Sequence, residues 1–462
     1  MLLSDLPHMR GKAVKSESTK PMDWNQLLST RRFSSSTNQH DIRSAFQRDY
    51  DRIIFSSPFR RLQNKTQVFP LPGSVFVHNR LTHSLEVASV GRSIARIIAR
   101  KLIADTPELA QSALNEIDTV VAAACLAHDL GNPPFGHSGE KAISSFFTEG
   151  EGRRLKDQVP EQQWTDLVEF EGNANAFRTL THQFEGRRKG GFSLTYATLA
   201  ALVKYPYPSF GKGKRKKYGV FHSELENFRL LMQECGIPVI ARDEAGNEVY
   251  ARHPLVYMVE AADDISYLIM DMEDAHKLGI LSTEETEALM LSLHSNDAQF
   301  HEYKNRIYKE VTDINERIAF LRATSINKLV EAVSKVFVDN VEIIMEGNFK
   351  GSLVDQLDEK LIDTLNYCRK VSIEKIYNHP AVIKIELTGF HVLGTLMQEF
   401  SQAVLSPEKN YHRKLKSLLP EQFKAQHDDT YSKLQSVIDF ISGMTDLYAM
   451  QLYKELRGID TY

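Results

Sequence analysis

Hydrophobic positions along this chain recur mainly at helical intervals. Between residues 80 and 105 the apolar side chains follow the spacing of about 3.6 residues that marks one face of a helix, namely Leu81, Leu85, Ala88, Ala95, Ile98 and Leu102. The apolar run 117–130 predicts a second helix, which Gly131 and the pair Pro133-Pro134 would end. Further helices are expected over 255–277, 284–293, 326–343 and 382–400.

Strict alternation of polar and apolar residues, which would predict strands, is scarce. Two short segments are candidates for hairpins, Thr66–Val77 and Val239–Tyr250, and Gly246-Asn247 could form the turn of the second. We therefore expect an all-α fold with additional C-terminal helices and minor β-hairpin decoration.

Composition along the chain suggests three stretches. Residues 1–40 are polar and rich in Ser, Thr and Arg, and we expect an N-terminal arm there. The residue types that carry chemistry concentrate in 41–280, which we expect to form the core. Residues 281–462 predict a helical C-terminal region that completes a pocket of that core.

Overall composition narrows the class of protein. Hydrophobic residues make up 42% and charged residues 25%, which excludes intrinsic disorder, and no apolar run approaches the length of a membrane span. A formal net charge of −4 argues against a nucleic-acid binder that uses its whole surface. The start of the chain lacks the apolar core of a signal peptide. Three widely separated cysteines, Cys125, Cys235 and Cys368, indicate a reducing compartment, so we expect a cytoplasmic protein with no membrane partner.

A candidate metal site begins with the adjacent pair His128 and Asp129. The pair lies at the end of an apolar helix, just before a Gly-Asn-Pro-Pro loop, where both side chains can point into one cleft. An imidazole and a carboxylate suit a divalent cation. Most isolated His-Asp pairs are surface or capping residues, so the pair alone is weak evidence.

Two further positions strengthen this interpretation. His83 lies near the start of an amphipathic helix, and the adjacent Asp263 and Asp264 lie inside an apolar one, where burial of two carboxylates is costly without a cation or partner. Either aspartate could be the ligand, although the spacing of Asp263 with Tyr267 and Asp271 along one helix favours Asp263. The alternative is that His83 is a core histidine and Asp263 caps a neighbouring helix.

These positions, read in order, resemble the H…HD…D signature of the HD superfamily of metal-dependent phosphohydrolases. The surrounding sequence is similar to its deoxyguanosine triphosphate triphosphohydrolase (dGTPase-like) branch. The resemblance covers about residues 30 to 400, and it rests on the segments Arg60–Phe69, Arg80–Val87, His128–Glu140, Phe170–Ala174, Glu260–Tyr267 and Tyr377–Glu386.

The resemblance implies a helical HD-domain fold and a bound divalent metal ion. Magnesium or manganese is expected, and iron, cobalt, nickel or zinc could occupy the same ligands. The implied ligands are His83, His128, Asp129 and Asp263.

The resemblance also implies a catalytic pair, His137 and Glu140. The two residues are three positions apart and share a face of a helix. A histidine oriented by a carboxylate suits general acid–base work. The alternative is a His-Glu pair that only caps the helix.

Substrate residues are implied in the same way. Gln67 and Val68 would line a deoxyribose pocket, with Tyr267 packed against the sugar. Asp263, Tyr267 and Asp271 form a polar stripe at four-residue intervals on one helix. Further implied contacts, to phosphates or base, come from Arg80, Asn173, Lys204, Tyr205, Asp271, Tyr377 and Glu386. Arg80 could instead be exposed, Lys204 could extend its charge into solvent, and Tyr377 and Glu386 could be ordinary helix residues.

The expected activity is metal-dependent hydrolysis of deoxynucleoside triphosphates, dGTP included, to deoxynucleoside and inorganic triphosphate. One alternative is an HD phosphodiesterase or nucleotidase acting on another phosphate ester. Another is a nucleotide- or nucleic-acid-binding module with a retired site. The resemblance implies a homo-oligomer, and a second nucleotide or single-stranded nucleic acid is a candidate effector. The basic run from Lys212 to Lys217 is expected to be a solvated loop outside the site.

Overall fold

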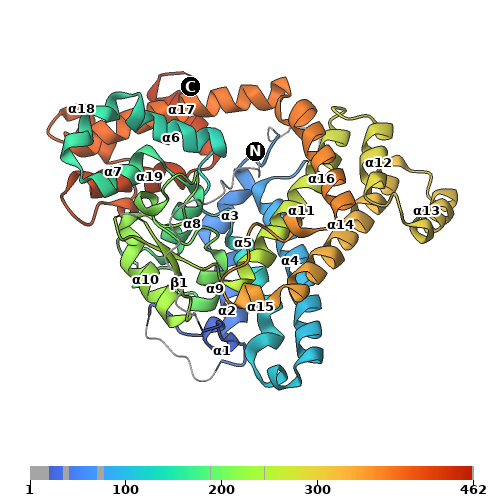
Figure 1. The fold of residues 1–462 in the computed structure, drawn as a ribbon. Coiled ribbons are helices and arrows are strands. Elements are labelled where there is room, and N and C mark those ends of the chain that lie inside the picture. The colour runs from blue at the N-terminus through green and yellow to red at the C-terminus, as the bar shows by residue number, and fades with distance from the viewer. Residues whose placement is uncertain (1–19, 35–40, 70–76, 188, 244, 460–462) are drawn as a thin grey trace.

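The chain folds into layers of packed helices, seen in a computed structural model that describes residues 20–34, 41–69, 77–187, 189–243 and 245–459 (Figure 1). The prediction of an all-α fold is confirmed. The first ten α-helices are α1 (Trp24–Leu27), α2 (Ala45–Ile54), α3 (Ser57–Arg61), α4 (Arg80–Asp105), α5 (Ile117–Ala127), α6 (His137–Thr148), α7 (Glu161–Val168), α8 (Gly172–Thr181), α9 (Tyr196–Leu202) and α10 (Leu225–Glu234). The others are α11 (Pro254–Lys277), α12 (Thr283–Ser292), α13 (Ala298–Glu310), α14 (Ile314–Asp339), α15 (Val341–Met345), α16 (Glu359–Val371), α17 (Pro380–Leu405), α18 (Asn410–Lys416), α19 (Thr430–Ser442) and α20 (Asp446–Leu456).

The centre of the molecule is formed by α4, α5 and α11. These helices pack on one another, and α2, α9 and α14 cover them. Helix α5 is apolar on all sides and almost fully buried, as its sequence requires. Gly91 allows α4 to approach α5 closely, because a Cβ atom at that position would lie 2.6 Å from the sulfur of Cys125. This close packing holds the ends of α4 and α5 near the middle of α11.

A second apolar cluster joins segments that lie far apart in the sequence. Helices α6 and α7 pack with α17, α19 and α20 of the C-terminal region. Figure 1 shows this arrangement as a teal and red lobe, with α17 running along its top toward α16. The C-terminal helices therefore cover the segment that follows the His128-Asp129 pair.

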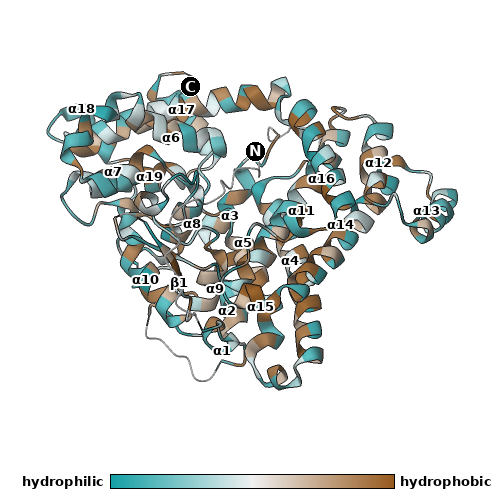
Figure 2. Ribbon diagram, in the orientation of Figure 1, coloured by the Kyte–Doolittle hydropathy of each residue, from teal (hydrophilic) through white to brown (hydrophobic). Residues whose placement is uncertain are grey.

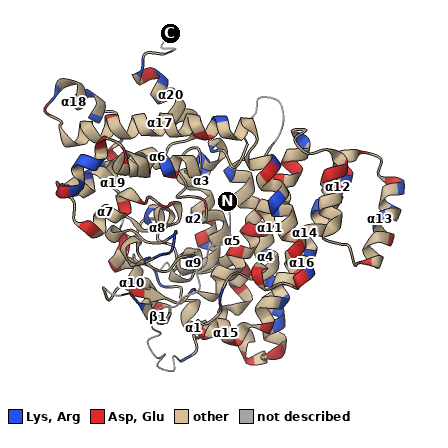
Figure 3. Ribbon diagram, turned by 45° about the horizontal axis from the view of Figure 1, so that its top comes forward, with Lys and Arg blue, Asp and Glu red and all other residues tan. Residues whose placement is uncertain are grey.

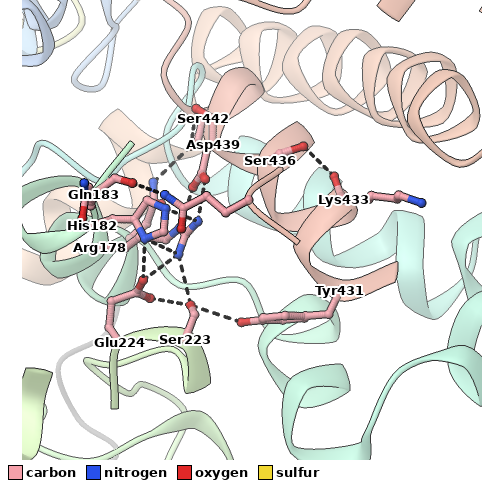
Figure 4. Close-up of polar contacts among 12 residues, drawn as sticks. Arg178, His182, Gln183, Ser223, Glu224, Tyr431, Lys433, Ser436, Asp439 and Ser442 are labelled. Carbon is pink, nitrogen blue, oxygen red and sulfur yellow. Dashed lines mark hydrogen bonds and ion pairs between the residues drawn. The ribbon is translucent and has the colours of Figure 1, made fainter. Parts of the chain in front are cut away.

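A buried ionic cluster also connects the two halves of the chain (Figure 4). The guanidinium of Arg178 on α8 donates to both carboxylate oxygens of Asp439 on α19, at 2.7 Å each. It also donates to Glu224 at 2.5 Å. Nearby, the hydroxyl of Tyr431 donates to Asp166 at 2.7 Å. Each of these charged groups has a partner of opposite charge or a hydrogen-bond donor.

The hairpin predicted at Val239–Tyr250 is present. Strands β1 (Val239–Arg242) and β2 (Glu248–Tyr250) pair antiparallel, and Gly246 adopts a positive φ of 82° in the connection. Of the other predicted hairpin, residues 70–76 lie outside the described residues, and Thr66 forms an isolated bridge with Asn79.

Part of the expected N-terminal arm belongs to the core. Residues 1–19 and 35–40 lie outside the described residues, but Trp24 and Leu27 of α1 are buried. The helix expected over 117–130 ends at Ala127, with His128 as its C-cap.

The outer helices are polar and carry both charges. Figure 2 shows hydrophilic residues over most of α13, and Figure 3 shows acidic and basic residues together along the ribbon of α13, α16 and α18. Among the described residues, no helix is both long enough and apolar enough to cross a membrane.

Candidate metal centre

Three central helices bring the predicted metal ligands together. His83 lies in the first turn of α4, which begins with a capping box between Asn79 and Thr82. His128 caps the end of α5, and Asp263 lies in the middle of α11. The packing of α4, α5 and α11 therefore places three residues from distant stretches of sequence at one point.

The ligand atoms of His83, His128 and Asp263 all lie within 4.8 Å of one another. The Oδ1 atom of Asp263 is 3.1 Å from Nε2 of His83 and 3.5 Å from Nε2 of His128. Two imidazole nitrogens and one carboxylate oxygen form a donor set suited to a divalent transition metal ion. These residues can therefore hold such an ion.

The ring of His128 is oriented for this task. Its Nδ1 atom lies 2.6 Å from the carbonyl oxygen of Cys125, one turn back on α5, so Nδ1 donates and Nε2 faces Asp263. Burial opposes a charge on His128, but Asp129 and Asp263 outweigh it and raise its pKa to about 9. Burial likewise opposes ionisation of Asp263, yet His128 and His83 hold its pKa well below the usual range. A cation bound here would take the place of that proton.

Asp129 lies beside this group but is already bound by two donors. Its Oδ2 atom accepts from Arg80 at 2.8 Å, its Oδ1 atom accepts from Asn132 at 2.5 Å, and Oδ1 is 3.6 Å from Nε2 of His128. Burial disfavours the carboxylate, but Arg80, followed by the nearby histidines, lowers its pKa. Arg80 is itself buried, which excludes the alternative of an exposed helix-start residue.

The adjacent Asp264 points elsewhere. It lines a small cavity with Leu329, Val333 and Arg369, and its Oδ2 atom has no hydrogen-bond partner among the described residues. Burial raises its pKa to about 7. The geometry therefore favours Asp263, and not Asp264, as the ligand.

His137 and Glu140 form a hydrogen-bonded pair at the start of α6. The Nδ1 atom of His137 lies 2.8 Å from Oε2 of Glu140, and the imidazole is half exposed while the carboxylate is buried. Burial opposes ionisation of Glu140, but His137, Lys217 and the backbone N–H of Gly172 lower its pKa to about 2. The pair combines an accessible imidazole with a fixed carboxylate, as acid–base catalysis requires.

Lys217 is a residue of this site that the sequence analysis left outside it. Its ammonium lies 2.9 Å from Glu171 and 3.7 Å from Glu140. Asn173 donates to the same Glu171 at 2.7 Å. The basic run is therefore not only a solvated loop: its last lysine reaches the acidic residues behind His137. A charge run with scattered glycines carries no sequence signal for that contact.

The aromatic side of the site is formed by α11 and the turn before α17. The rings of Tyr267 and Tyr377 stack with centroids 5.8 Å apart, and Tyr267 also meets the ring of His83 edge-on at 6.5 Å. The hydroxyl of Tyr377 donates to Asp271 at 2.7 Å. Burial raises the pKa of Asp271 to about 8, although the bond from Tyr377 opposes that shift. The predicted polar stripe of α11 thus faces the metal group at one end and Tyr377 at the other.

Gln67 and Val68 lie on the segment that pairs with the start of α4. Val68 is half-buried against the main apolar cluster. The Oε1 atom of Gln67 is buried and has no hydrogen-bond partner among the described residues. An unpaired buried acceptor is costly, so it points to a ligand with a donor.

Lys204 and Tyr205 lie behind the metal group. The Lys204 ammonium is 3.1 Å from Glu260, which also binds Arg252 at 3.0 Å, and it lies 5.8 Å from the centre of the Tyr205 ring. Burial opposes the charge on Lys204, but Glu260 outweighs it and raises the pKa. Glu386, by contrast, is exposed on α17 and forms no hydrogen bond or ion pair with any residue that the structure describes.

Two family models match the chain. The HD domain matches residues 80–205, which include His83, His128, Asp129, His137 and Glu140. The phosphohydrolase-associated domain matches residues 356–455.

Relatives match over nearly the whole length. A deoxyguanosinetriphosphate triphosphohydrolase-like protein of Synechocystis sp. is 38% identical over 458 residues, covering 95% of this chain and 100% of the relative. One from Pseudomonas aeruginosa is 37% identical over 455 residues, covering 95% and 99%. The deoxyguanosinetriphosphate triphosphohydrolase of Yersinia enterocolitica is 30% identical over 521 residues, covering 95% and 99%. The chain therefore belongs to the deoxyguanosinetriphosphate triphosphohydrolase-like family of HD-domain phosphohydrolases.

Proposed function

We propose that this protein hydrolyses deoxynucleoside triphosphates to deoxynucleoside and inorganic triphosphate, and that it needs a divalent metal ion. The observation that carries the proposal is the convergence of His83, His128 and Asp263 in a chain whose relatives bear the names given above. His137 and Glu140, on the helix after the same loop, supply acid–base groups.

The metal would be held by His83, His128 and Asp263, with Asp129 beside them. An ion held by these residues would supply Lewis-acid chemistry, the polarisation of a phosphate oxygen and a lower pKa of a water molecule. Arg80 fixes Asp129 and carries a buried Nε–H without a partner among the described residues. That donor is suited to a phosphate oxygen or to its bridging water.

In the proposed reaction a water oxygen attacks the α-phosphorus, and the bond between phosphorus and the 5′ oxygen breaks. The leaving 5′ oxygen must gain a proton. Glu140 holds Nδ1 of His137, so Nε2 of that half-exposed ring can deliver the proton or orient the water. Lys217 lies beside Glu140 and Lys204 beside Glu260, and their ammonium groups would offset phosphate charge. The neutral amide of Asn173, beside Glu171, would donate a hydrogen bond.

The sugar would bind between Tyr267 and the segment that carries Gln67 and Val68. The unpaired Oε1 atom of Gln67 accepts a hydrogen bond from a sugar hydroxyl. Tyr267 is held by its stack on Tyr377, and its ring would exclude a 2′-hydroxyl by contact. Discrimination between deoxyribose and ribose then rests on rigid packing.

Product analysis tests the proposal. Purified protein with Mn²⁺ or Mg²⁺ is incubated with each of the four deoxynucleoside triphosphates, singly and mixed, and with the matching ribonucleotides. Release of intact triphosphate from a deoxynucleotide, with loss of activity in a chelator and recovery on adding metal, supports it. Release of only pyrophosphate or single phosphates from every nucleotide contradicts it and favours another phosphate ester as substrate.

A further inference from the structure

Asp446, the first residue of α20, is a buried carboxylate that binds two loops of the site. Its Oδ1 atom accepts from the backbone N–H of Phe135 at 3.0 Å. Its Oδ2 atom accepts from the backbone N–H of Thr66 at 2.8 Å. The side chain is only 6% exposed, so water does not replace these contacts readily.

Lys65 ties the same three segments together from the other side. Its buried ammonium donates to the carbonyl of Asn132 at 2.6 Å and to the carbonyl of Ser442 at 2.8 Å. Asn175 of α8 adds a third connection, because its amide donates to the carbonyl of Gly131 at 2.8 Å and to the hydroxyl of Ser442 at 3.1 Å. The turn between α19 and α20 is therefore bound to the loop 131–135 at several points.

That loop joins the metal group to the catalytic pair. It begins two residues after Asp129 and ends two residues before His137. The carbonyl of Lys65 also accepts from the N–H of Arg80 at 3.2 Å. The contacts of Asp446 and Lys65, which we call the clamp, therefore reach the start of α4. The loop 131–135 and the start of α4, which flank the metal group, are thus in contact with Asp446 or with Lys65.

The conformation of the loop needs such a restraint. Phe135 has a φ of 61°, which is uncommon for a bulky residue, and Gly136 follows with a φ of 58°. A Cβ atom on Gly136 would lie 2.7 Å from the guanidinium of Arg80. Residues in such conformations persist when the surroundings hold them, and Asp446 binds the N–H of Phe135 itself.

We propose that Asp446, assisted by Lys65, is a positioning residue that sets the place of the His137–Glu140 pair relative to the metal group. This inference rests on the proposed phosphohydrolase function for its kinetic consequence. A role in docking α19 alone does not account for the arrangement, because Arg178 and Asp439 already fasten that helix to α8.

The first test compares Asp446→Ala, Asp446→Asn and Lys65→Met with Asp439→Asn. Asp439→Asn also weakens a buried contact of α19, but among the described residues Asp439 forms no hydrogen bond with the loop that contains Thr66 or with the loop 131–135. We expect Asp446→Ala to lower kcat by about tenfold to a hundredfold, since a small misplacement of catalytic groups has an effect of that size. KM and the Mn²⁺ dissociation constant should stay within about threefold, because no metal ligand contacts Asp446. Asp446→Asn keeps one acceptor oxygen, so its kcat should lie between those of the wild type and Asp446→Ala. Lys65→Met should also lower kcat.

Asp439→Asn should lower the melting temperature at least as much as Asp446→Asn while keeping kcat within about threefold. The proposal is overturned if Asp446→Ala keeps the wild-type kcat. It is also overturned if Asp439→Asn, with an equal loss of stability, loses as much kcat as the Asp446 variants do.

A second readout does not depend on the substrate. Hydrogen exchange of the peptides containing Thr66 and Phe135 should accelerate in Asp446→Asn and remain at the wild-type rate in Asp439→Asn. Unchanged exchange in Asp446→Asn overturns the clamp even if activity falls. If the wild-type protein releases no triphosphate, the proposed function fails, and exchange together with Mn²⁺ binding still tests the clamp.

Discussion

Two buried polar clusters of this protein differ in how their charges are matched. In the Arg178 cluster one guanidinium lies between two carboxylates and donates hydrogen bonds of 2.5 to 2.7 Å to them. In the metal group two imidazole nitrogens face one carboxylate oxygen at 3.1 and 3.5 Å, and the three ligand atoms all lie within 4.8 Å of one another. The first cluster is complete without a ligand, whereas the second is arranged to receive a cation.

Buried charge therefore has a different role in each of the two clusters. A cluster that satisfies its own donors and acceptors contributes to folding and to the junction of two chain segments. A group of imidazoles and a carboxylate whose ligand atoms lie within 4.8 Å of one another indicates a binding site. Mutations in the two clusters should therefore separate stability from catalysis.

The largest expected effect is that of Asp263→Asn. Removing a ligand takes away several kcal/mol of transition-state stabilisation, so kcat should fall by roughly a thousandfold or more. Asp264→Asn is the matched control, because this neighbouring carboxylate faces a small cavity lined mainly by apolar side chains. It should keep kcat within about threefold. Turnover and Mn²⁺ titration of both variants check the prediction, and the opposite ranking would identify Asp264 as the ligand.

The second effect is on stability. Arg178→Met leaves Asp439 and Glu224 buried without their cation, and it should lower the free energy of unfolding by about 3–5 kcal/mol. Denaturant unfolding measures this loss. At temperatures where the variant stays folded, kcat should remain close to that of the wild type. A catalytic loss much larger than the loss of folded protein would show that the two clusters are coupled.

The third effect concerns the acid–base pair. Glu140→Gln keeps an acceptor for the N–H of Gly172 but no longer stabilises a charged His137, so kcat should fall by about a hundredfold. Steady-state kinetics and a pH profile measure it. Lys141→Ala, an exposed neighbour on α6, serves as control. Wild-type turnover in Glu140→Gln would leave the pair with a capping role only.

The smallest effect is a pH dependence of stability that arises from His253. Its pKa is lowered, whereas that of His128 is raised. His253 caps α11, accepting from Leu255 and donating to the carbonyl of Leu27, and burial lowers its pKa to about 4. The unfolded chain therefore binds a proton below about pH 6.5 that the folded chain does not, so stability falls as pH decreases from 6.5 to 4. This residue should contribute roughly 2 to 3 kcal/mol of that fall. Denaturant unfolding at pH 7 and pH 4.5 should show a smaller difference for His253→Asn than for the wild type, and equal differences would contradict the assignment.

Much of the architecture follows from local patterns. The long helices around residues 80–105 and 254–277 match their apolar periodicity, and the hairpin at Val239–Tyr250 matches its turn residues. Helix ends were less predictable: α5 stops at Ala127, with His128 as its C-cap, although the predicted helix extends to Leu130.

The spacing of apolar residues was enough to predict the helical class, and the motif segments resemble the family to which the chain belongs. The packing of the helices was needed to show that Lys217 lies near Glu140 and that Asp446 binds the loop before His137, and it agrees with the motif register in placing Asp263 beside the two histidines. Each of these contacts joins residues at least 77 positions apart. The packing of helices sets such distances, and no local pattern encodes which face of one helix meets another.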